Sequence, residues 1–167
     1  LYAEDGEQLI VRTKEAYDGA VPSGNSAAAR VLQQLAQITG QTKWQEILDK
    51  QLHYLAGAMA GYPPGHSYGL LVMMDVLYPT KELVCVLSPS YGGEGRMLLL
   101  ARLGYLAQIT PGLSVTVKTE DNAQALGELV PYTRDYPLPG KGAMFYLCCG
   151  SNCMPPVTEL GAIVDKL

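Results

Sequence analysis

The chain has 167 residues, of which 48% are hydrophobic and 17% charged, and its formal net charge is −4 at pH 7. A charged fraction below the roughly 25% of typical soluble domains predicts apolar surface that a partner or further chain covers. The acidic balance and the lack of a basic run argue against a nucleic-acid partner. No apolar run reaches the roughly 18 residues that a membrane span needs, so no membrane partner is expected.

The start of the chain, LYAEDGEQ, has neither a basic segment nor an apolar core, so we expect no signal peptide. It lacks an initiator methionine, which indicates a piece of a longer protein. One separate cysteine and three clustered ones do not form the pattern of a secreted disulfide framework. We therefore expect a cytoplasmic protein in a reducing compartment.

The first predicted helix runs from about Asn25 to Thr39, after a short strand-like segment at residues 8–14. Asn25 or Ser26 is expected as its N-cap and Gly40 as its end. Its apolar residues recur at helical spacing. They are Ala28, Val31, Leu32, Leu35 and Ile38.

A second helix is predicted to start at Thr42, where TKWQ fits a capping box formed by Thr42 and Gln45. Gly61 and the two prolines that follow it end this helix. Its apolar residues form one continuous stripe. They are Trp44, Ile47, Leu48, Leu52, Leu55 and Met59.

A third helix is expected after the PGHS segment and ends before Pro79. Its predicted apolar positions are Leu70, Leu71, Met74 and Leu77. The connections between the three helices are short, which predicts antiparallel neighbours. Residues 1–80 are therefore predicted to form antiparallel helical hairpins.

Beyond residue 80 the pattern changes to strands that alternate with helices. Short runs rich in β-branched or aromatic residues predict strands at 83–88, 113–118 and 143–148. Thr158 is the expected N-cap of a last helix. Because this alternation is typical of βαβ units, residues 81–167 are predicted to form a small, parallel, three-stranded βαβαβα layer. The fold class is α+β, and the strand order stays open.

Two motifs at opposite ends of the chain resemble those of one family. DGAVPSGNS, residues 18–26, is similar to a DGAxPSxNS segment, and YLCCGSNCMPPVT, residues 146–158, is similar to a YxCxxxxCxxPxT signature. Both occur in thioredoxin-domain proteins related to spermatogenesis-associated protein 20, which have bacterial and archaeal relatives. The KELVCVL strand also matches an xxIVIxG strand of that family. Together the motifs cover essentially the whole chain in the right order.

This resemblance implies a larger protein with three parts: a thioredoxin-like domain, a six-hairpin α/α toroid and a C-terminal α/β region. The toroid is similar to those of N-acylglucosamine 2-epimerases and six-hairpin glycosidases. Residues 1–80 would be its closing hairpins and residues 81–167 the α/β region. The partner would be the missing upstream chain, with the thioredoxin-like domain and the rest of the toroid. An isolated piece is expected to form homo-oligomers through its apolar faces.

In related toroids the inner mouth binds sugars, so the resemblance implies a carbohydrate ligand and a set of binding residues. These are Arg12, Lys14, Asp18, Ser23 and Asn25. The same residue types also fit a capped helix start in which Asp18 turns the chain, without any ligand. Both interpretations stay open at this point.

Catalysis by this chain alone has few candidate residues. A glycosidase needs two carboxylates around one bond, and an epimerase of this type needs paired acid–base groups, often histidines. His53 is expected on or within a helix, and His66 is expected to cap a helix or to be exposed. Asp18 is a weak catalytic candidate, whose partner would come from missing chain.

Three cysteines cluster at Cys148, Cys149 and Cys153. A zinc site needs four ligands, and one C-x4-C without a second pair or a nearby histidine does not predict a metal. The thioredoxin-type CxxC is absent too. Either Cys148 and Cys153 are buried thiols, or they are a redox-responsive pair, since the turn can bring their Cα atoms within roughly 4.4–6.8 Å. Cys149 should face the opposite side of the strand.

Glycines before the helix at GGEGRMLLL suggest a phosphate loop, but the Walker lysine and the GxGxxG spacing are missing, so no cofactor is expected.

The sequence and the resemblance together lead to two hypotheses about function. The first is a non-catalytic C-terminal region of a thioredoxin-domain protein of unknown function, which contributes toroid architecture and part of a pocket. The alternative is a carbohydrate-active fragment, epimerase- or glycosidase-like, with its pocket at the PSGNS loop.

Overall fold

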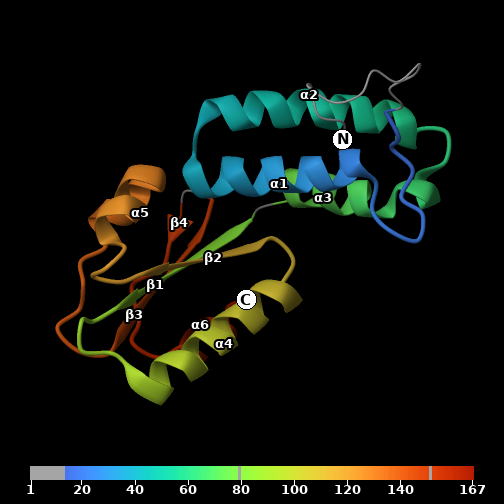
Figure 1. Cartoon of the computed structure of the whole chain (residues 1–167). Helices are drawn as coiled ribbons and strands as arrows, with labels where there is room; N and C mark the ends of the chain where they lie inside the picture. Colours follow the sequence, from blue (N-terminus) through green and yellow to red (C-terminus); the bar gives the residue numbers. More distant parts are fainter. Residues whose placement is uncertain (1–13, 79, 151) are drawn as a thin grey trace, which may run out of the picture. The chain divides into compact units, whose positions relative to one another are not determined.

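The structure is a computed structural model that describes residues 14–78, 80–150 and 152–167. It contains both helices and a β-sheet, as the predicted α+β class requires (Figure 1). The chain divides into two compact units. Among the described residues, the helical unit comprises residues 14–37 together with Gln41–Leu77, and the sheet unit comprises the residues from Tyr78 on together with Ile38–Gly40.

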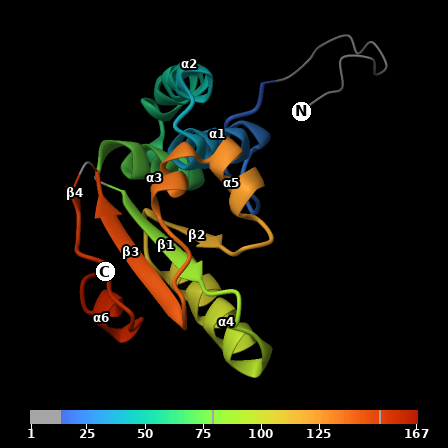
Figure 2. The same ribbon diagram turned by 90° about the vertical axis from the view of Figure 1, so that its left-hand side faces the viewer.

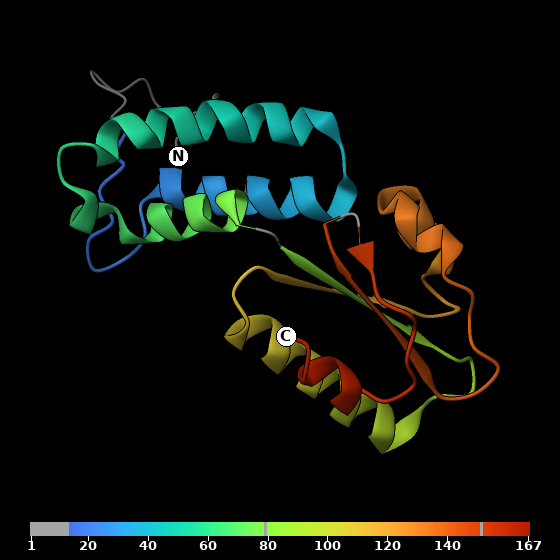
Figure 3. The same ribbon diagram turned by 180° about the vertical axis from the view of Figure 1, so that it is seen from behind.

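The helical unit holds three α-helices that lie side by side, and the chain reverses its direction from each to the next (Figures 1 and 3). They are α1 (Gly24–Thr39), α2 (Thr42–Met59) and α3 (Ser67–Leu77), with a short 3-10 helix, η1 (Pro63–His66), before α3. The strand-like segment predicted at residues 8–14 falls almost wholly outside the described residues, and Lys14 itself is not in a strand.

Helix α1 begins one residue earlier than predicted, and its N-cap is Ser23 rather than Asn25 or Ser26. The Ser23 hydroxyl accepts a hydrogen bond from the Ser26 N–H at 3.1 Å, and the Ser23 carbonyl accepts one from the Ala27 N–H at 2.9 Å. This is the reach of an N-cap side chain to the third helical residue. The helix ends at Gly40 as predicted, where φ is +63°.

Helix α2 lacks the predicted capping box because Thr42 is already its first helical residue and Gln41 occupies the N-cap position. Gln45 instead donates from Nε2 to Asp49 Oδ1 at 2.9 Å, one turn further along. The predicted apolar stripe is largely confirmed. Leu48, Leu52, Leu55 and Met59 are buried, whereas Ile47 is exposed.

The apolar faces predicted for α1 and α3 are buried only in part: Leu32 and Leu70 pack against the core of the helical unit, whereas Val31, Leu71, Met74 and Leu77 are exposed. Helix α1 instead buries a partly polar face, and α3 buries a face with a glycine at its centre. The buried residues are Ser26, Ala29 and Gln33 in α1, and Gly69 and Val72 in α3. Periodicity identified the helices, but contacts with neighbouring segments, the Asp18 loop among them, decided which side turns inward.

The sheet has four strands in the order β2-β1-β3-β4. They are β1 (Lys81–Leu87), β2 (Leu113–Lys118), β3 (Ala143–Cys149) and β4 (Asn152–Cys153). Strand β1 pairs in parallel with β2 but antiparallel with β3, so the prediction of a three-stranded parallel sheet was wrong. Ala143 at the start of β3 pairs with Leu87 at the end of β1, so β3 starts at the end of the sheet where β1 and β2 finish. Side chains alternate in the same way in both strand directions, so the sequence pattern carries no information on direction.

The helices of the sheet unit are α4 (Gly93–Ile109), α5 (Ala123–Leu129) and α6 (Gly161–Val164), with the 3-10 helix η2 (Pro131–Asp135) after α5. Helices α4 and α5 lie on opposite sides of the sheet (Figures 1 and 2). Helix α6 is shorter than predicted, and its N-cap is Leu160 rather than Thr158. Val157 forms a β-bridge with Phe145, which holds this part of the chain extended.

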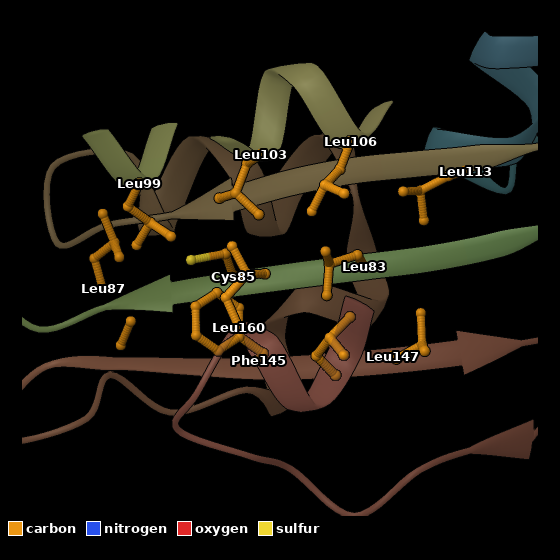
Figure 4. Packing of buried hydrophobic residues seen from close by; sticks show 12 residues of the cluster. Leu83, Cys85, Leu87, Leu99, Leu103, Leu106, Leu113, Phe145, Leu147 and Leu160 are labelled. Carbon is orange, nitrogen blue, oxygen red and sulfur yellow. The ribbon is translucent and has the colours of Figure 1, made fainter. Parts of the chain in front are cut away.

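One face of the sheet forms the core of the sheet unit (Figure 4). Leucines of α4 pack there on the odd-numbered residues of β1 and β3, together with residues of the C-terminal segment. The buried members include Leu83, Cys85, Leu87, Leu99, Leu103, Leu106, Phe145, Leu147, Leu160 and Ile163. Side chains alternate across a strand, so the even-numbered residues lie on the opposite face. Four of them, Glu82, Lys118, Tyr146 and Cys148, are called the polar sheet face below.

No helix within the described ranges is both long enough and apolar enough to cross a bilayer.

Candidate functional site

Asp18 lies in the loop before α1, and its carboxylate is buried, with 7% of the residue exposed. Oδ1 accepts a hydrogen bond from the Ser23 N–H at 2.8 Å. Oδ2 accepts one from the Ser26 hydroxyl at 3.1 Å and one from the Gly69 N–H of α3 at 3.0 Å. Asp18 therefore joins three segments: its own loop, the start of α1 and the start of α3.

The electrostatics of Asp18 favour its ionised form. Burial by itself would raise the pKa of the Asp18 carboxyl, but the hydrogen bonds from Ser23, Gly69 and Ser26 outweigh burial and lower the pKa below its ordinary value. A carboxylate that accepts several hydrogen bonds is stabilised as the anion. Asp18 therefore keeps its charge and lacks the raised pKa of a general acid.

The Asp18 backbone and the neighbouring serine side chains form further hydrogen bonds around the carboxylate. The Asp18 N–H donates to the Gly65 carbonyl at 2.7 Å. The Ser23 hydroxyl donates to the Ser26 hydroxyl at 3.0 Å, which in turn donates to Asp18. The residues of the PSGNS loop thus satisfy one another, and Ser23 is buried with Asp18. This arrangement matches the predicted capped helix start.

The other predicted binding residues lie outside this hydrogen-bonded group. Arg12 falls outside the described residues. Lys14 is exposed, and its carbonyl accepts a hydrogen bond from the Tyr54 hydroxyl. Asn25 donates from Nδ2 to the Glu15 carbonyl at 2.6 Å and accepts from Gln51 Nε2 at 3.1 Å. Among the four predicted residues that the structure describes, it brings together only Asp18 and Ser23 around one carboxylate.

The two histidines do not join this group. His53 is exposed on α2, which is the surface one of the two predicted positions, helix surface or packing. His66 is buried rather than exposed, with Nδ1 2.9 Å from the Tyr62 carbonyl and its ring edge-on to Tyr17. Neither ring comes within hydrogen-bond distance of Asp18 in the described part of the chain, so no acid–base pair forms there.

The clustered cysteines are placed by β3 and β4. Cys148 and Cys153 are cross-strand neighbours joined by a disulfide, with Cα atoms 4.0 Å apart, slightly closer than the predicted range. Cys148 is buried, as predicted for the end of a strand, but Cys153 is exposed and does not pack as a buried thiol. Cys149 is a free, exposed thiol.

The remaining cysteine has a buried thiol of low reactivity. Cys85 lies at the centre of the core, and burial raises the pKa of its thiol to about 12. A thiol protonated at neutral pH is neither a good nucleophile nor a metal ligand. Within the described residues, no three histidine, cysteine or acidic side chains converge in a way that could hold a metal ion.

Of the polar sheet face, only Cys148 was a predicted site residue. Lys118 is buried, and its Nζ donates to the carbonyls of Thr133 and Tyr136, both at 2.7 Å. These bonds hold η2 and the residue after it against the sheet. The Tyr136 ring stacks on Tyr146 with centroids 4.2 Å apart, and its hydroxyl lies 3.7 Å from Cys148 Sγ.

Glu82 is the carboxylate of this face, directly across the strand pair from Cys148. It is half-buried, and burial raises the pKa of its carboxyl. Burial also raises the pKa of the Tyr132 and Tyr136 hydroxyls, and the charge of Glu82 raises both further. Sequence reasoning missed this group because Glu82 and Tyr136 are far apart along the chain. The pairing of residue 82 with the first clustered cysteine depends on the antiparallel register of β1 and β3, which the sequence pattern did not predict.

A pocket of about 540 Å³ opens elsewhere in the sheet unit. Its walls come from α4, the start of β3 and the segment before α6, with Phe145 and Leu99 among the apolar residues. Its charged residues are Arg102, Lys141 and Glu159, all of which are exposed at the surface. No feature of these residues selects one ligand class.

No family model, curated protein or solved structure matches this chain. The family indicated by its two motifs therefore stays a prediction.

Proposed function

We propose that this chain is the C-terminal region of a thioredoxin-domain protein and that its role is architectural. In this proposal α1–α3 form helical hairpins of an α/α toroid, and the missing upstream chain supplies the other hairpins. The sheet unit is the α/β region that follows the toroid. The DGAVPSGNS and C-x4-C-x-x-P motifs are the sequence features on which the family assignment depends.

The proposal rests mainly on apolar side chains of α1 and α3 that are exposed to solvent. Val31 is 54% exposed, Leu71 56% and Met74 52%. In a helical layer such side chains are expected to contact another helix, since a surface helix normally turns its apolar stripe inward. Further hairpins of a toroid would cover them.

The alternative, a carbohydrate-active enzyme centred on Asp18, has less support. Its catalytic carboxylate would need an open face toward the sugar and a second acid–base group. Asp18 is buried, receives three hydrogen bonds from the protein and has a lowered pKa. These contacts fit a residue that fixes the start of two helices better than one that reacts with a ligand.

The test is to introduce charge on the exposed apolar face in two contexts. The double substitution Leu71→Glu with Met74→Glu should barely change the thermal midpoint of the isolated chain, since both side chains are more than half exposed. In the intact parent protein it should cost several kcal/mol, because two charges would be buried without partners. His53→Glu, which adds a charge on the exposed side of α2, is the control and should change neither midpoint.

Equally small effects in both contexts would contradict the proposal, because the face would then be free in the whole protein. The isolated chain should also associate with increasing concentration, and the double substitution should reduce that association in light scattering.

A further inference from the structure

The two sulfurs of the Cys148–Cys153 disulfide lie in different surroundings. Cys148 is 6% exposed on the polar sheet face, whereas Cys153 on β4 is exposed to solvent. An external thiolate can therefore reach the Cys153 sulfur, and Cys148 is then the sulfur that leaves. The rate of such an exchange depends on access to the attacked sulfur and on how well the leaving thiolate is stabilised.

The leaving sulfur has a hydrogen-bond donor. The Tyr136 hydroxyl is 3.7 Å from Cys148 Sγ. A disulfide sulfur carries no hydrogen, so the hydroxyl must be the donor in this contact. The bond strengthens when the sulfur becomes a thiolate, because hydrogen bonds to ionised groups are stronger than neutral ones.

Tyr136 is held in place for this contact from two sides. Its ring stacks on Tyr146, and its backbone carbonyl accepts a hydrogen bond from the buried Lys118 amine. Burial and the neighbouring Glu82 raise the pKa of the Tyr136 hydroxyl, so it remains protonated and able to donate at neutral and mildly alkaline pH.

We propose that Cys148 and Cys153 form a redox-active disulfide that exchanges with an external dithiol, with Cys153 as the attacked sulfur and Tyr136 as the catalytic residue that stabilises the Cys148 thiolate. The proposal concerns the sheet unit alone and does not depend on the architectural role proposed above.

The exchange proceeds in two balanced steps. A thiolate of the dithiol attacks Cys153 Sγ, forming a mixed disulfide, and the Cys148–Cys153 bond breaks with its electron pair on Cys148 Sγ. That thiolate accepts the hydrogen bond from Tyr136 and takes a proton from water. The second thiol of the donor, after losing its proton, attacks the mixed disulfide and releases Cys153, which is protonated in turn. The dithiol is oxidised by two electrons, and the protein disulfide is reduced by the same two.

The first experiment measures reduction of the folded chain by dithiothreitol, followed by alkylation and mass spectrometry at timed points. Tyr136→Phe should slow reduction roughly tenfold, because it removes the hydroxyl and keeps the ring. Tyr105→Phe, at an exposed tyrosine of α4, should leave the rate unchanged. An unchanged rate in a folded Tyr136→Phe protein would overturn the role of Tyr136.

The second experiment identifies the attacked sulfur with oxidised glutathione as probe. Both variants carry Cys149→Ser, because Cys149 is a free, exposed thiol that would itself react. In this background Cys148→Ser leaves the Cys153 thiol and should form a glutathione adduct at least tenfold faster than Cys153→Ser, which leaves the buried Cys148. Equal rates would overturn the assignment of Cys153. A wild-type disulfide that resists millimolar dithiothreitol until the protein unfolds would show a purely structural bond and overturn the whole proposal.

Discussion

Asp18 in the helical unit and Glu82 in the sheet unit are both carboxylates withdrawn from water, but the protein surrounds them differently. Asp18 accepts three hydrogen bonds, and its pKa is lowered. No hydrogen bond from the described residues reaches the Glu82 carboxylate, and burial raises its pKa. The Asp18 carboxylate holds the starts of two helices together. The Glu82 carboxylate instead lies across the strand pair from the disulfide cysteine Cys148, and its charge acts on the Tyr136 hydroxyl.

This difference bears on how a functional site is recognised. The most conspicuous polar motif in the sequence, DGAVPSGNS, folds into a closed hydrogen-bonded group. The disulfide for which we propose redox exchange instead lies at the edge of the sheet, where the sulfur of an exposed cysteine is bonded to that of a buried one. A polar loop with few unsatisfied groups stabilises a fold, whereas reactivity needs an accessible atom.

The largest expected effect is at Asp18. Asp18→Asn removes the charge and should lower the free energy of unfolding by about 2–4 kcal/mol, because three hydrogen bonds to a buried anion are weakened or lost. Glu15→Gln, at an exposed carboxylate of the same loop, is the matched control and should change stability by less than about 0.5 kcal/mol. Urea unfolding at pH 7 measures both.

The pH dependence sharpens this prediction. A lowered pKa means that the folded state holds the Asp18 proton less tightly than the unfolded state, so the stabilisation is fully present above the unfolded pKa. It is lost as pH falls from about 4 through the folded pKa. The difference between wild type and Asp18→Asn should therefore shrink in acid. A difference that is constant from pH 7 to pH 3 would contradict a role for the charge.

The next effect tests the contact between Asp18 and α3. In Gly69→Ala the added methyl group would overlap Cε of Met59 and lie 3.1 Å from Ser26 Oγ, beside the hydrogen bonds to Asp18. We expect a loss of about 1–2 kcal/mol, because the neighbours must move. Gly57→Ala in α2 meets no atom within 4 Å and should instead gain about 0.5–1 kcal/mol from helix propensity. Thermal unfolding of both variants would show opposite signs, and equal gains would argue against close packing at Gly69.

The smallest effect is expected at Glu82, with the opposite sign to that at Asp18. Since its folded pKa is raised, the folded state gains relative stability below the unfolded pKa and loses it as pH rises through the folded pKa. Glu82→Gln should therefore stabilise the protein at pH 7, by no more than about 1 kcal/mol because the group is only half-buried. At pH 3 the gain should vanish. Glu120→Gln, at an exposed site, should have no effect at either pH.

The sequence predicted most of the helices and the three longer strands, because their periodicity is a local property. The end of α1 at Gly40, the end of α2 before Gly61 and the position of Cys148 at a strand end all follow from residue types and spacing. Helix starts were less predictable. Several serine, asparagine and threonine residues compete for each N-cap, and the choice of Ser23 depends on which hydroxyl reaches an N–H in three dimensions.

The tertiary structure decided what local patterns leave open. Which face of α1 is buried, and that β3 runs antiparallel to β1, depend on the segments that pack beside them. The saturation of Asp18 needs an N–H from Gly69, 51 residues away along the chain. The contact between Tyr136 and Cys148 needs a loop that Lys118 fixes to the sheet. Residue types and spacing determined which polar groups and thiols the chain contains. Only the packing of distant segments decided which of these groups are hydrogen-bonded inside the protein and which are exposed to solvent.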